Sequence, residues 1–359
     1  MNRLTERSRC TGCGVCGAVC GSGAIRMRPD REGFLYPEID SALCIGCGKC
    51  TEVCPVLQGG AQTAVPVCYG VQAGEGTRDM GSSGGMFPLL ASHILDQGGA
   101  VFGAALLEGG VVRHICVRGR EALPQITRTK YVQSDLSQVW EELRLRLREG
   151  PVLFCGTPCQ TDAVRAYLGE DRSGAILVDL ICYGVPSPGI WGRYVKYLEK
   201  TWGGPLQEFT FRDKRAAHGR ACSFRIGKKE RVRPLGQDPF CRTYFKNVNI
   251  RPACFQCRYA TVERSSDLTL GDFWGIDGVR PGFDDGAGCS VVLCHTPAGA
   301  RLWDRVKGEA RWFQCRPEDA ANEAQPRLNR PVQPSPRRSL LMRLYGRIPF
   351  RIWLRLASR

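Results

Sequence analysis

The sequence predicts an α+β protein, in which a small N-terminal domain rich in cysteine precedes a larger α/β domain. Two observations support this prediction. A cysteine pattern occurs twice in the first sixty residues, and short apolar runs alternate with amphipathic stretches from about residue 65 onward. The 359 residues have room for two or three domains. We therefore predict domains at 1–60 and 65–325, and a basic amphipathic tail at 326–359.

The cysteines of the first domain form an internal repeat with the spacing C-x2-C-x2-C-x3-C, and the second copy lies 34 residues after the first. A tight run of this kind supplies three thiolates to one 4Fe-4S cluster, and its fourth cysteine reaches the other cluster. The spacing therefore predicts two 4Fe-4S clusters. Their ligands would be Cys10, Cys13, Cys16 and Cys54 for one, and Cys20, Cys44, Cys47 and Cys50 for the other.

Zinc knuckles are the alternative for these cysteines, but they normally use two separated pairs with no third cysteine close by. Residues 24–27 and 33–40 are typical of the short paired strands of a ferredoxin, and residues 59–63 end the domain. One departure is that Pro55 follows Cys54, as expected, whereas Gly21 follows Cys20. The ligand spacing is kept, so the two-cluster prediction stands.

Composition limits the classes of function. No charged and then apolar leader precedes the first cysteine, so we expect a cytoplasmic protein whose clustered cysteines bind metal instead of forming disulfides. No apolar run approaches the roughly 20 residues that span a bilayer. The net charge is +15, but residues 327–359 carry nine arginines and no acid, which leaves +6 for the rest. The four scattered histidines favour neither a zinc site nor a catalytic triad.

The larger domain contains alternating strands and helices. We predict strands at 99–104, 151–155 and 175–181, and helices at 86–95 and 139–147. A turn at 156–160 would be followed by a further helix through residue 168. Cys159 and Cys182 follow two successive strands, at the edge where open α/β sheets bind ligands. Cys254 and Cys257 add a C-x2-C pair. From the residues alone, these four cysteines are compatible with an iron–sulfur cluster, a small zinc site or unligated thiols.

Several motifs occur in a fixed order with these cysteines, at residues 82–85, 130–134, 156–160, 179–187, 211–214 and 267–275. Together they resemble the coenzyme F420 hydrogenase/dehydrogenase beta-subunit family, in its bacterial form with an N-terminal two-cluster ferredoxin domain. The resemblance covers nearly the whole chain, to about residue 335. It implies a flavoprotein domain with FAD beside a further 4Fe-4S cluster, whose cysteines match Cys159, Cys182, Cys254 and Cys257.

Two segments are candidates for the flavin site that the resemblance implies. Ser83, Gly84 and Gly85 precede a predicted helix, whose first N–H groups would meet a flavin phosphate. Thr129, Lys130 and Tyr131 form the other segment, with Lys130 supplying charge and Tyr131 a stacking or hydrogen-bonding surface. This segment departs from the family pattern, because Arg128-Thr129 stands where a Gly-Ser or Gly-Thr lead-in is expected.

The function that follows is an oxidoreductase in which electrons pass between 4Fe-4S clusters and FAD to reduce or oxidise a small molecule or a partner. We expect a redox partner protein or small electron carrier, a small-molecule substrate, and no nucleic acid. The alternative is a ferredoxin-type relay subunit without a substrate site of its own. Families of this kind change substrate while keeping the scaffold, so coenzyme F420 is one candidate among several.

The C-terminal tail repeats arginine at every fourth position from Arg343 to Arg359, opposite an apolar side. This pattern predicts an amphipathic helix, which Pro349 would kink. Its apolar side either lies on an anionic membrane, as a peripheral contact, or packs on the body of the protein.

Overall fold

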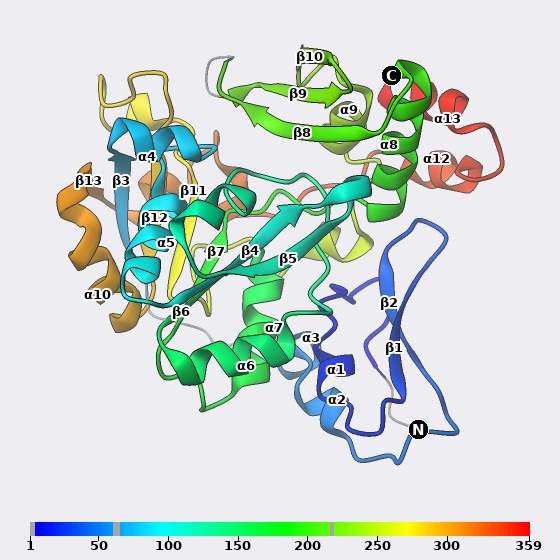
Figure 1. The fold of residues 1–359 in the computed structure, drawn as a ribbon, viewed down its shortest axis with the longest axis horizontal. Coiled ribbons are helices and arrows are strands. Elements are labelled where there is room, and N and C mark those ends of the chain that lie inside the picture. Colours follow the sequence, from blue (N-terminus) through cyan, green and yellow to red (C-terminus); the bar gives the residue numbers. More distant parts are fainter. Residues whose placement is uncertain (1–3, 60–64, 216–218) are drawn as a thin grey trace.

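The computed structural model describes residues 4–59, 65–215 and 219–359. Figure 1 shows a small N-terminal unit beside a larger unit that contains a central sheet and a smaller second sheet. This arrangement confirms the predicted fold class. The predicted end of the first domain at residues 60–63, together with His218, lies outside the described residues, and the domain boundaries stay a prediction.

The N-terminal unit consists of short elements wrapped around its cysteines. They are the helices α1 (Val15–Ala18), α2 (Lys49–Glu52) and α3 (Pro55–Gln58), and the antiparallel strands β1 (Ile25–Pro29) and β2 (Leu35–Ile39). Gly14 and Gly48 precede α1 and α2 at φ values of 82° and 81°, a conformation that glycine adopts without steric cost. The two equivalent glycines thus start the same turn in both copies of the repeat.

The central sheet has eight strands in the order β13-β3-β12-β11-β7-β6-β4-β5. Strands β4, β6, β7 and β11 are parallel neighbours in its centre, and the outer strands are antiparallel. In chain order the strands are β3 (Val67–Ala73), β4 (Ala100–Leu106), β5 (Val112–Val117), β6 (Val152–Gly156), β7 (Ala175–Leu180), β11 (Leu268–Asp272), β12 (Ser290–Cys294) and β13 (Ala310–Cys315).

Helices cover both faces of this sheet, because its central strands are apolar on both sides. On one face Leu153 packs with α5 (Met86–Asp96) and α10 (Pro297–Val306). On the other face Phe154 packs with α6 (Trp140–Glu149) and α7 (Pro158–Leu168). The short helices α4 (Glu75–Met80) and α11 (Pro317–Ala320) flank the sheet. The predicted strands and helices of this region are confirmed, to within a few residues at their ends.

The second sheet has its own core. It contains β8 (Leu206–Asp213), β9 (Ala221–Ile226) and β10 (Lys229–Pro234), and packs with α8 (Pro188–Trp202) and α9 (Pro239–Phe245). The tail adds α12 (Arg338–Leu344) and α13 (Phe350–Ser358) to the same core, and Pro349 stands directly before α13. The apolar side of the tail therefore packs on the body of the protein. None of the helices formed by the described residues has the length and apolarity that crossing a bilayer requires.

Trp353 of α13 is fully buried and donates its indole N–H to the carbonyl of Leu341 at 2.8 Å. We expect Trp353→Ala to lower the free energy of unfolding by about 3–5 kcal/mol, because it leaves a large cavity in the second core. Anaerobic urea unfolding measures this change. The neighbouring Ile352 is 51% exposed, and Ile352→Ala is the matched control with an expected loss below about 1 kcal/mol. Equal losses in the two variants would contradict the packing of the tail.

Candidate functional site

The first group of cysteines combines residues from both copies of the repeat. Burial raises the pKa of the Cys13 thiol to about 11, and the negative charges of Cys10 and Cys54 add to the increase. The pKa of Cys16 is raised by burial and then by the charges of Cys13, Cys10 and Cys54. Cys10, Cys13, Cys16 and Cys54 therefore lie close together, in the combination that the spacing predicts.

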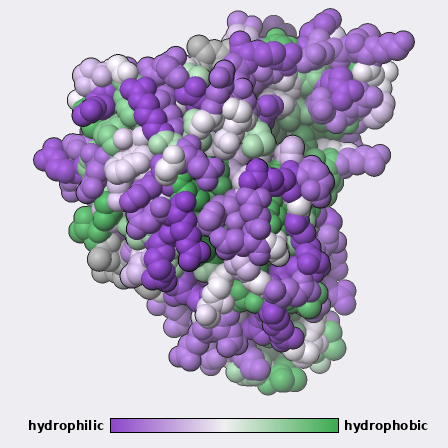
Figure 2. Space-filling view, turned by 60° about the vertical axis from the view of Figure 1, so that its left-hand side comes forward, coloured by the Kyte–Doolittle hydropathy of each residue, from purple (hydrophilic) through white to green (hydrophobic). Residues whose placement is uncertain are grey.

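The second group lies at the outer end of the N-terminal unit. Burial, followed by the charges of Cys20 and Cys47, raises the pKa of the Cys50 thiol. Cys47 is exposed and Cys44 is half-buried, and the side chain of Ile45 between them is 76% exposed. In Figure 2, apolar side chains appear at the lower tip of the molecule, where Figure 1 places this unit. This group is thus the one nearest the outside.

The third group brings together the four cysteines of the larger unit. Cys159 lies in the first turn of α7, Cys182 follows β7, and Cys254 and Cys257 lie in and after a short 3-10 segment (Pro252–Gln256). Burial and then the Cys257 charge raise the pKa of Cys182 to about 12. The pKa of Cys159 is raised strongly by burial and further by the other three thiolates. The C-terminal edge of the parallel strands therefore gathers four sulfurs that are distant in sequence.

Arg251 joins the first and third groups. This side chain is 1% exposed, and it donates to the carbonyl of Cys10 at 2.7 Å, to Gln133 Oε1 at 3.0 Å and to the carbonyl of Leu35 at 2.9 Å. A Cβ atom on Gly12 would lie 2.6 Å from the same guanidinium group, so that position requires glycine. Arg251 also stands three residues before Cys254. Arg251 thus connects the segment that carries Cys10 to the segment that carries Cys254.

A large pocket opens beside the third group. Its volume is about 800 Å³, and Cys182 forms part of its wall. Five of the six residues predicted for flavin binding line it, namely Ser83, Gly85, Thr129, Lys130 and Tyr131. Gly84 lies behind the wall, where an added Cβ would be 2.4 Å from the carbonyl oxygen of Val71. The pocket also receives the N-terminal end of α5, whose residues Met86 and Phe87 line it.

The two predicted flavin-binding segments meet at this pocket. The backbone N–H of Thr129 donates to Ser82 Oγ at 2.8 Å, which joins the segments directly. The preceding Arg128 has a φ of 63°, in the region that favours glycine. Arg128 stands where the family pattern has glycine, and it adopts the left-handed backbone conformation that glycine favours.

Lys130 is a half-buried cation of the pocket wall. Its Nζ donates to the carbonyls of Thr127 at 2.5 Å and Gln125 at 3.3 Å. Burial lowers the pKa of Lys130 to about 7, and no carboxylate is among the causes of this shift. An anionic ligand in the pocket would pair with the ammonium group of Lys130 in place of a carboxylate.

His114 belongs to the pocket wall although the sequence gives no reason to select it. The ring stacks on Phe154 at 5.0 Å, and its two nitrogens contact Ser134 Oγ and the carbonyl of Cys155. Burial lowers the pKa of His114 to about 4, so the ring is neutral at pH 7. Its partners come from separate segments, and only the fold brings them together.

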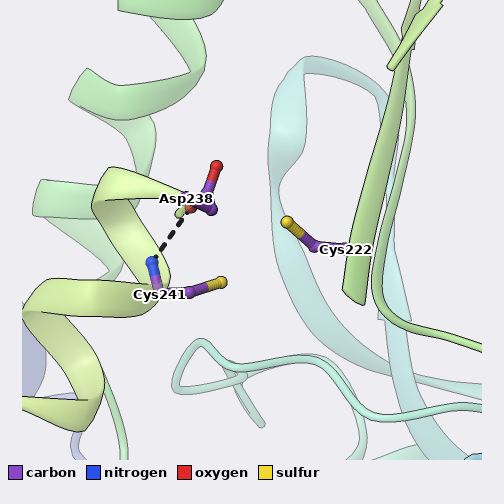
Figure 3. Close-up of side chains that lie close together, drawn as sticks. All are labelled: Cys222, Asp238 and Cys241. Carbon is purple, nitrogen blue, oxygen red and sulfur yellow. Dashed lines mark hydrogen bonds between the residues drawn. The ribbon is translucent and has the colours of Figure 1, made fainter. Parts of the chain in front are cut away.

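A further group, Cys222, Asp238 and Cys241, lies in the second core, with its sulfur and oxygen atoms within 4.8 Å of one another (Figure 3). Asp238 already accepts hydrogen bonds from the Cys241 backbone N–H at 3.0 Å and from the Tyr194 hydroxyl at 2.5 Å. The group supplies three ligand atoms among the described residues, whereas structural zinc normally has four. Its contacts are those of a hydrogen-bonded core cluster.

Two family models match parts of the chain. Residues 150–319 match the family model for the C terminus of the coenzyme F420 hydrogenase/dehydrogenase beta subunit, and residues 9–57 match the model of a 4Fe-4S dicluster domain. A similar solved structure is a chain of the F420-reducing [NiFe] hydrogenase complex from Methanosarcina barkeri, studied by xenon derivatization. It is 16% identical, with a TM-score of 0.46, over 83% of this chain and 91% of that chain. No curated protein matches the chain.

Proposed function

We propose that the chain is an iron–sulfur flavoprotein oxidoreductase, because residues 150–319 match the coenzyme F420 hydrogenase/dehydrogenase beta-subunit model and residues 9–57 match a 4Fe-4S dicluster domain. It would pass electrons between 4Fe-4S clusters and FAD to reduce or oxidise a small molecule or a partner. The observation that carries this proposal is the meeting of the third cysteine group and the 800 Å³ pocket at one edge of the sheet, with Cys182 in both.

The cysteine groups are the proposed cluster ligands. The first group would hold one cluster, and Cys20, Cys44, Cys47 and Cys50 a second. A third cluster would be held by Cys159, Cys182, Cys254 and Cys257. Burial raises the pKa of Cys182 and Cys257, and the nearby Arg264, which forms a buried ion pair with Asp179 at 2.9 Å, offsets part of this increase. A cation at this place favours the thiolates that a cluster requires.

The residues of the pocket fit FAD. When bound, FAD would supply the exchange between two-electron chemistry and the one-electron chemistry of clusters. The backbone N–H groups at the start of α5 and the ammonium group of Lys130 would bind its phosphates. Tyr131 would orient the cofactor, and the apolar wall from Met86 and Phe87 would exclude water. Ser83 and Gly85 shape the turn before α5, and Thr129 fixes the opposite loop through Ser82.

The order of the cysteine groups suggests where a partner acts. The second group lies at the exposed tip of the N-terminal unit. The first group lies next to the larger unit, to which Arg251 connects it. A redox partner protein or small electron carrier would therefore meet the exposed tip around Cys47. A small-molecule substrate would enter the pocket. We expect the protein to act in the cytoplasm, where thiols stay reduced.

Iron, sulfide and flavin content of anaerobically purified protein tests the proposal. About twelve irons and one FAD per chain are expected, together with a flavin band in the visible spectrum. About eight irons without flavin would overturn it, and the relay subunit would then be the better description. That relay would also co-purify with a catalytic partner and show no turnover alone.

The affinity for FAD is expected to fall as the pH rises, because the Lys130 pKa of about 7 lies within the working range. Lys130 is charged below pH 7 and neutral above it, so the attraction to phosphate is present at pH 6 and lost at pH 8. We expect the dissociation constant to rise about tenfold per pH unit above 7. Fluorescence titration with FAD measures it.

Lys130→Met should bind FAD weakly and lose this pH dependence. Lys130→Arg, which keeps a charge at every pH used, should bind FAD with an affinity that is flat from pH 6 to 8. A wild-type affinity that stays constant over this range would remove Lys130 from the proposed site.

A further inference from the structure

Cys68 and Cys315 face each other across two strands of the central sheet. Cys68 lies in β3 and Cys315 ends the edge strand β13, and the two residues are direct partners in the antiparallel register. Their sulfur atoms are 3.4 Å apart. Directly opposed residues in antiparallel strands have Cα atoms about 4.5 or 5.5 Å apart. Both spacings fall within the roughly 4.4–6.8 Å that a disulfide accepts, so the backbone need not move for a bond to form.

The two thiols differ in exposure and in acidity. Cys68 is fully buried, whereas Cys315 is half-buried at the edge of the sheet. The hydrogen bond between them lowers the pKa of Cys315 and raises that of Cys68, with burial adding to the increase at Cys68. Cys315 is therefore the accessible thiol that ionises first, and Cys68 is the protected thiol behind it. This is the usual arrangement of an attacking and a resolving cysteine.

We propose that Cys68 and Cys315 form a redox-active dithiol, which low-molecular-weight disulfides such as oxidised glutathione convert to a cross-strand disulfide. The Cys315 thiolate attacks one sulfur of the small disulfide, which breaks its S–S bond and releases one thiolate. Cys68 then loses its proton and attacks the Cys315 sulfur of the mixed disulfide, releasing the second small thiol. The protein loses two hydrogens, and the small disulfide is reduced to two thiols.

A disulfide between Cys68 and Cys315 would restrain a segment that forms part of the pocket wall. From Cys315 the chain passes through α11 to Asn322 and Gln325, which bind the carbonyls of Trp274 at 3.0 Å and Asp272 at 2.7 Å. Gln325 lines the pocket, as does Arg327. A disulfide would tie the start of this segment to the inner strand β3. The dithiol itself does not depend on the proposed function, because neither thiol belongs to the proposed cluster ligands.

The test equilibrates the full protein, purified anaerobically, with buffers of reduced and oxidised glutathione, followed by alkylation and peptide mapping. We expect a Cys68–Cys315 disulfide peptide in the oxidising buffer, and its loss in Cys315→Ser. Cys68→Ser should instead retain one glutathione on Cys315, because the resolving thiol is missing. That trapped adduct also separates exchange chemistry from simple misfolding of a variant.

The Cys222 and Cys241 thiols provide an internal control in the same sample. They also lie close together, but both are fully buried. We expect the Cys68–Cys315 peptide to exceed a Cys222–Cys241 peptide by at least about tenfold, since access limits thiol exchange. The proposal would be overturned by reduced Cys68 and Cys315 in the most oxidising buffer, by no adduct in Cys68→Ser, or by equal oxidation of the control pair.

Discussion

Replacing Cys254 with serine is expected to lower the iron content from about twelve to about eight atoms per chain, with sulfide falling in proportion. Serine offers a hard hydroxyl in place of the soft thiolate that an iron–sulfur cluster requires. Burial raises the pKa of the Cys254 thiol, and the nearby thiolates of Cys182 and Cys257 raise it further, so the four sulfurs need the positive charge of iron to ionise together. Iron and sulfide assays on anaerobically purified protein measure the change.

Cys116→Ser is the matched control, because Cys116 is a half-buried cysteine of the same unit, on strand β5 away from the third group. It should keep all of its iron. Electron paramagnetic resonance of the reduced Cys254→Ser protein should still show the two interacting clusters of the N-terminal unit. An unchanged iron content in Cys254→Ser would show that the third group holds no cluster, and would leave those two clusters as the whole complement.

Arg251→Ala is expected to detach the N-terminal unit from the larger unit, at a cost of about 3–5 kcal/mol in the free energy of unfolding. The substitution leaves three buried acceptors without their donor: the carbonyls of Cys10 and Leu35, and Gln133 Oε1. It also removes the guanidinium group that lies 4.3 Å from the centre of the Tyr36 ring. Hydrogen exchange followed by mass spectrometry should show faster exchange in residues 4–59, and the thermal midpoint should fall.

Arg258→Ala provides the comparison for Arg251→Ala. Arg258 also donates to a carbonyl of the N-terminal unit, that of Pro55 at 3.1 Å, but its side chain is exposed. Water can replace that bond, so we expect a loss below about 1 kcal/mol and normal exchange. If the two variants behaved alike, the buried bridge would contribute no more than a surface contact, and the coupling of the first and third groups through Arg251 would be wrong.

The predictions of the first cysteine group and of the strands and helices rest on different physical reasons. The grouping of Cys10, Cys13, Cys16 and Cys54 could be predicted because ligand spacing within a short run restricts which sulfurs can converge. The strands and helices from residue 99 to 181 could be predicted because apolar periodicity reports which side of each element is buried. The sequence also located five of the six proposed flavin residues in the pocket wall, through motifs and not through geometry.

The positions and partners of other residues could not be predicted from the sequence. Gly84 follows Ser83 in a glycine-rich turn, and only its position against Val71 shows that it serves packing and not the pocket. His114 and Arg251 gain their roles from partners that are 20 to 241 residues away in the sequence. The tail left two interpretations open. Its apolar side packs on the second core in the folded chain, where Trp353 is fully buried.

By itself, the sequence determined the local chemistry: two cysteine runs, the order of strands and helices, and an amphipathic tail, because each depends on spacing along the chain. Only the tertiary structure decided which distant groups meet. The parallel centre of the sheet brings Cys159 and Cys182 to one edge, the antiparallel edge strand sets Cys315 opposite Cys68, and Arg251 fills a buried gap between two units. Contacts between distant residues depend on how helices and strands pack, and the spacing of residues along the chain does not specify this packing.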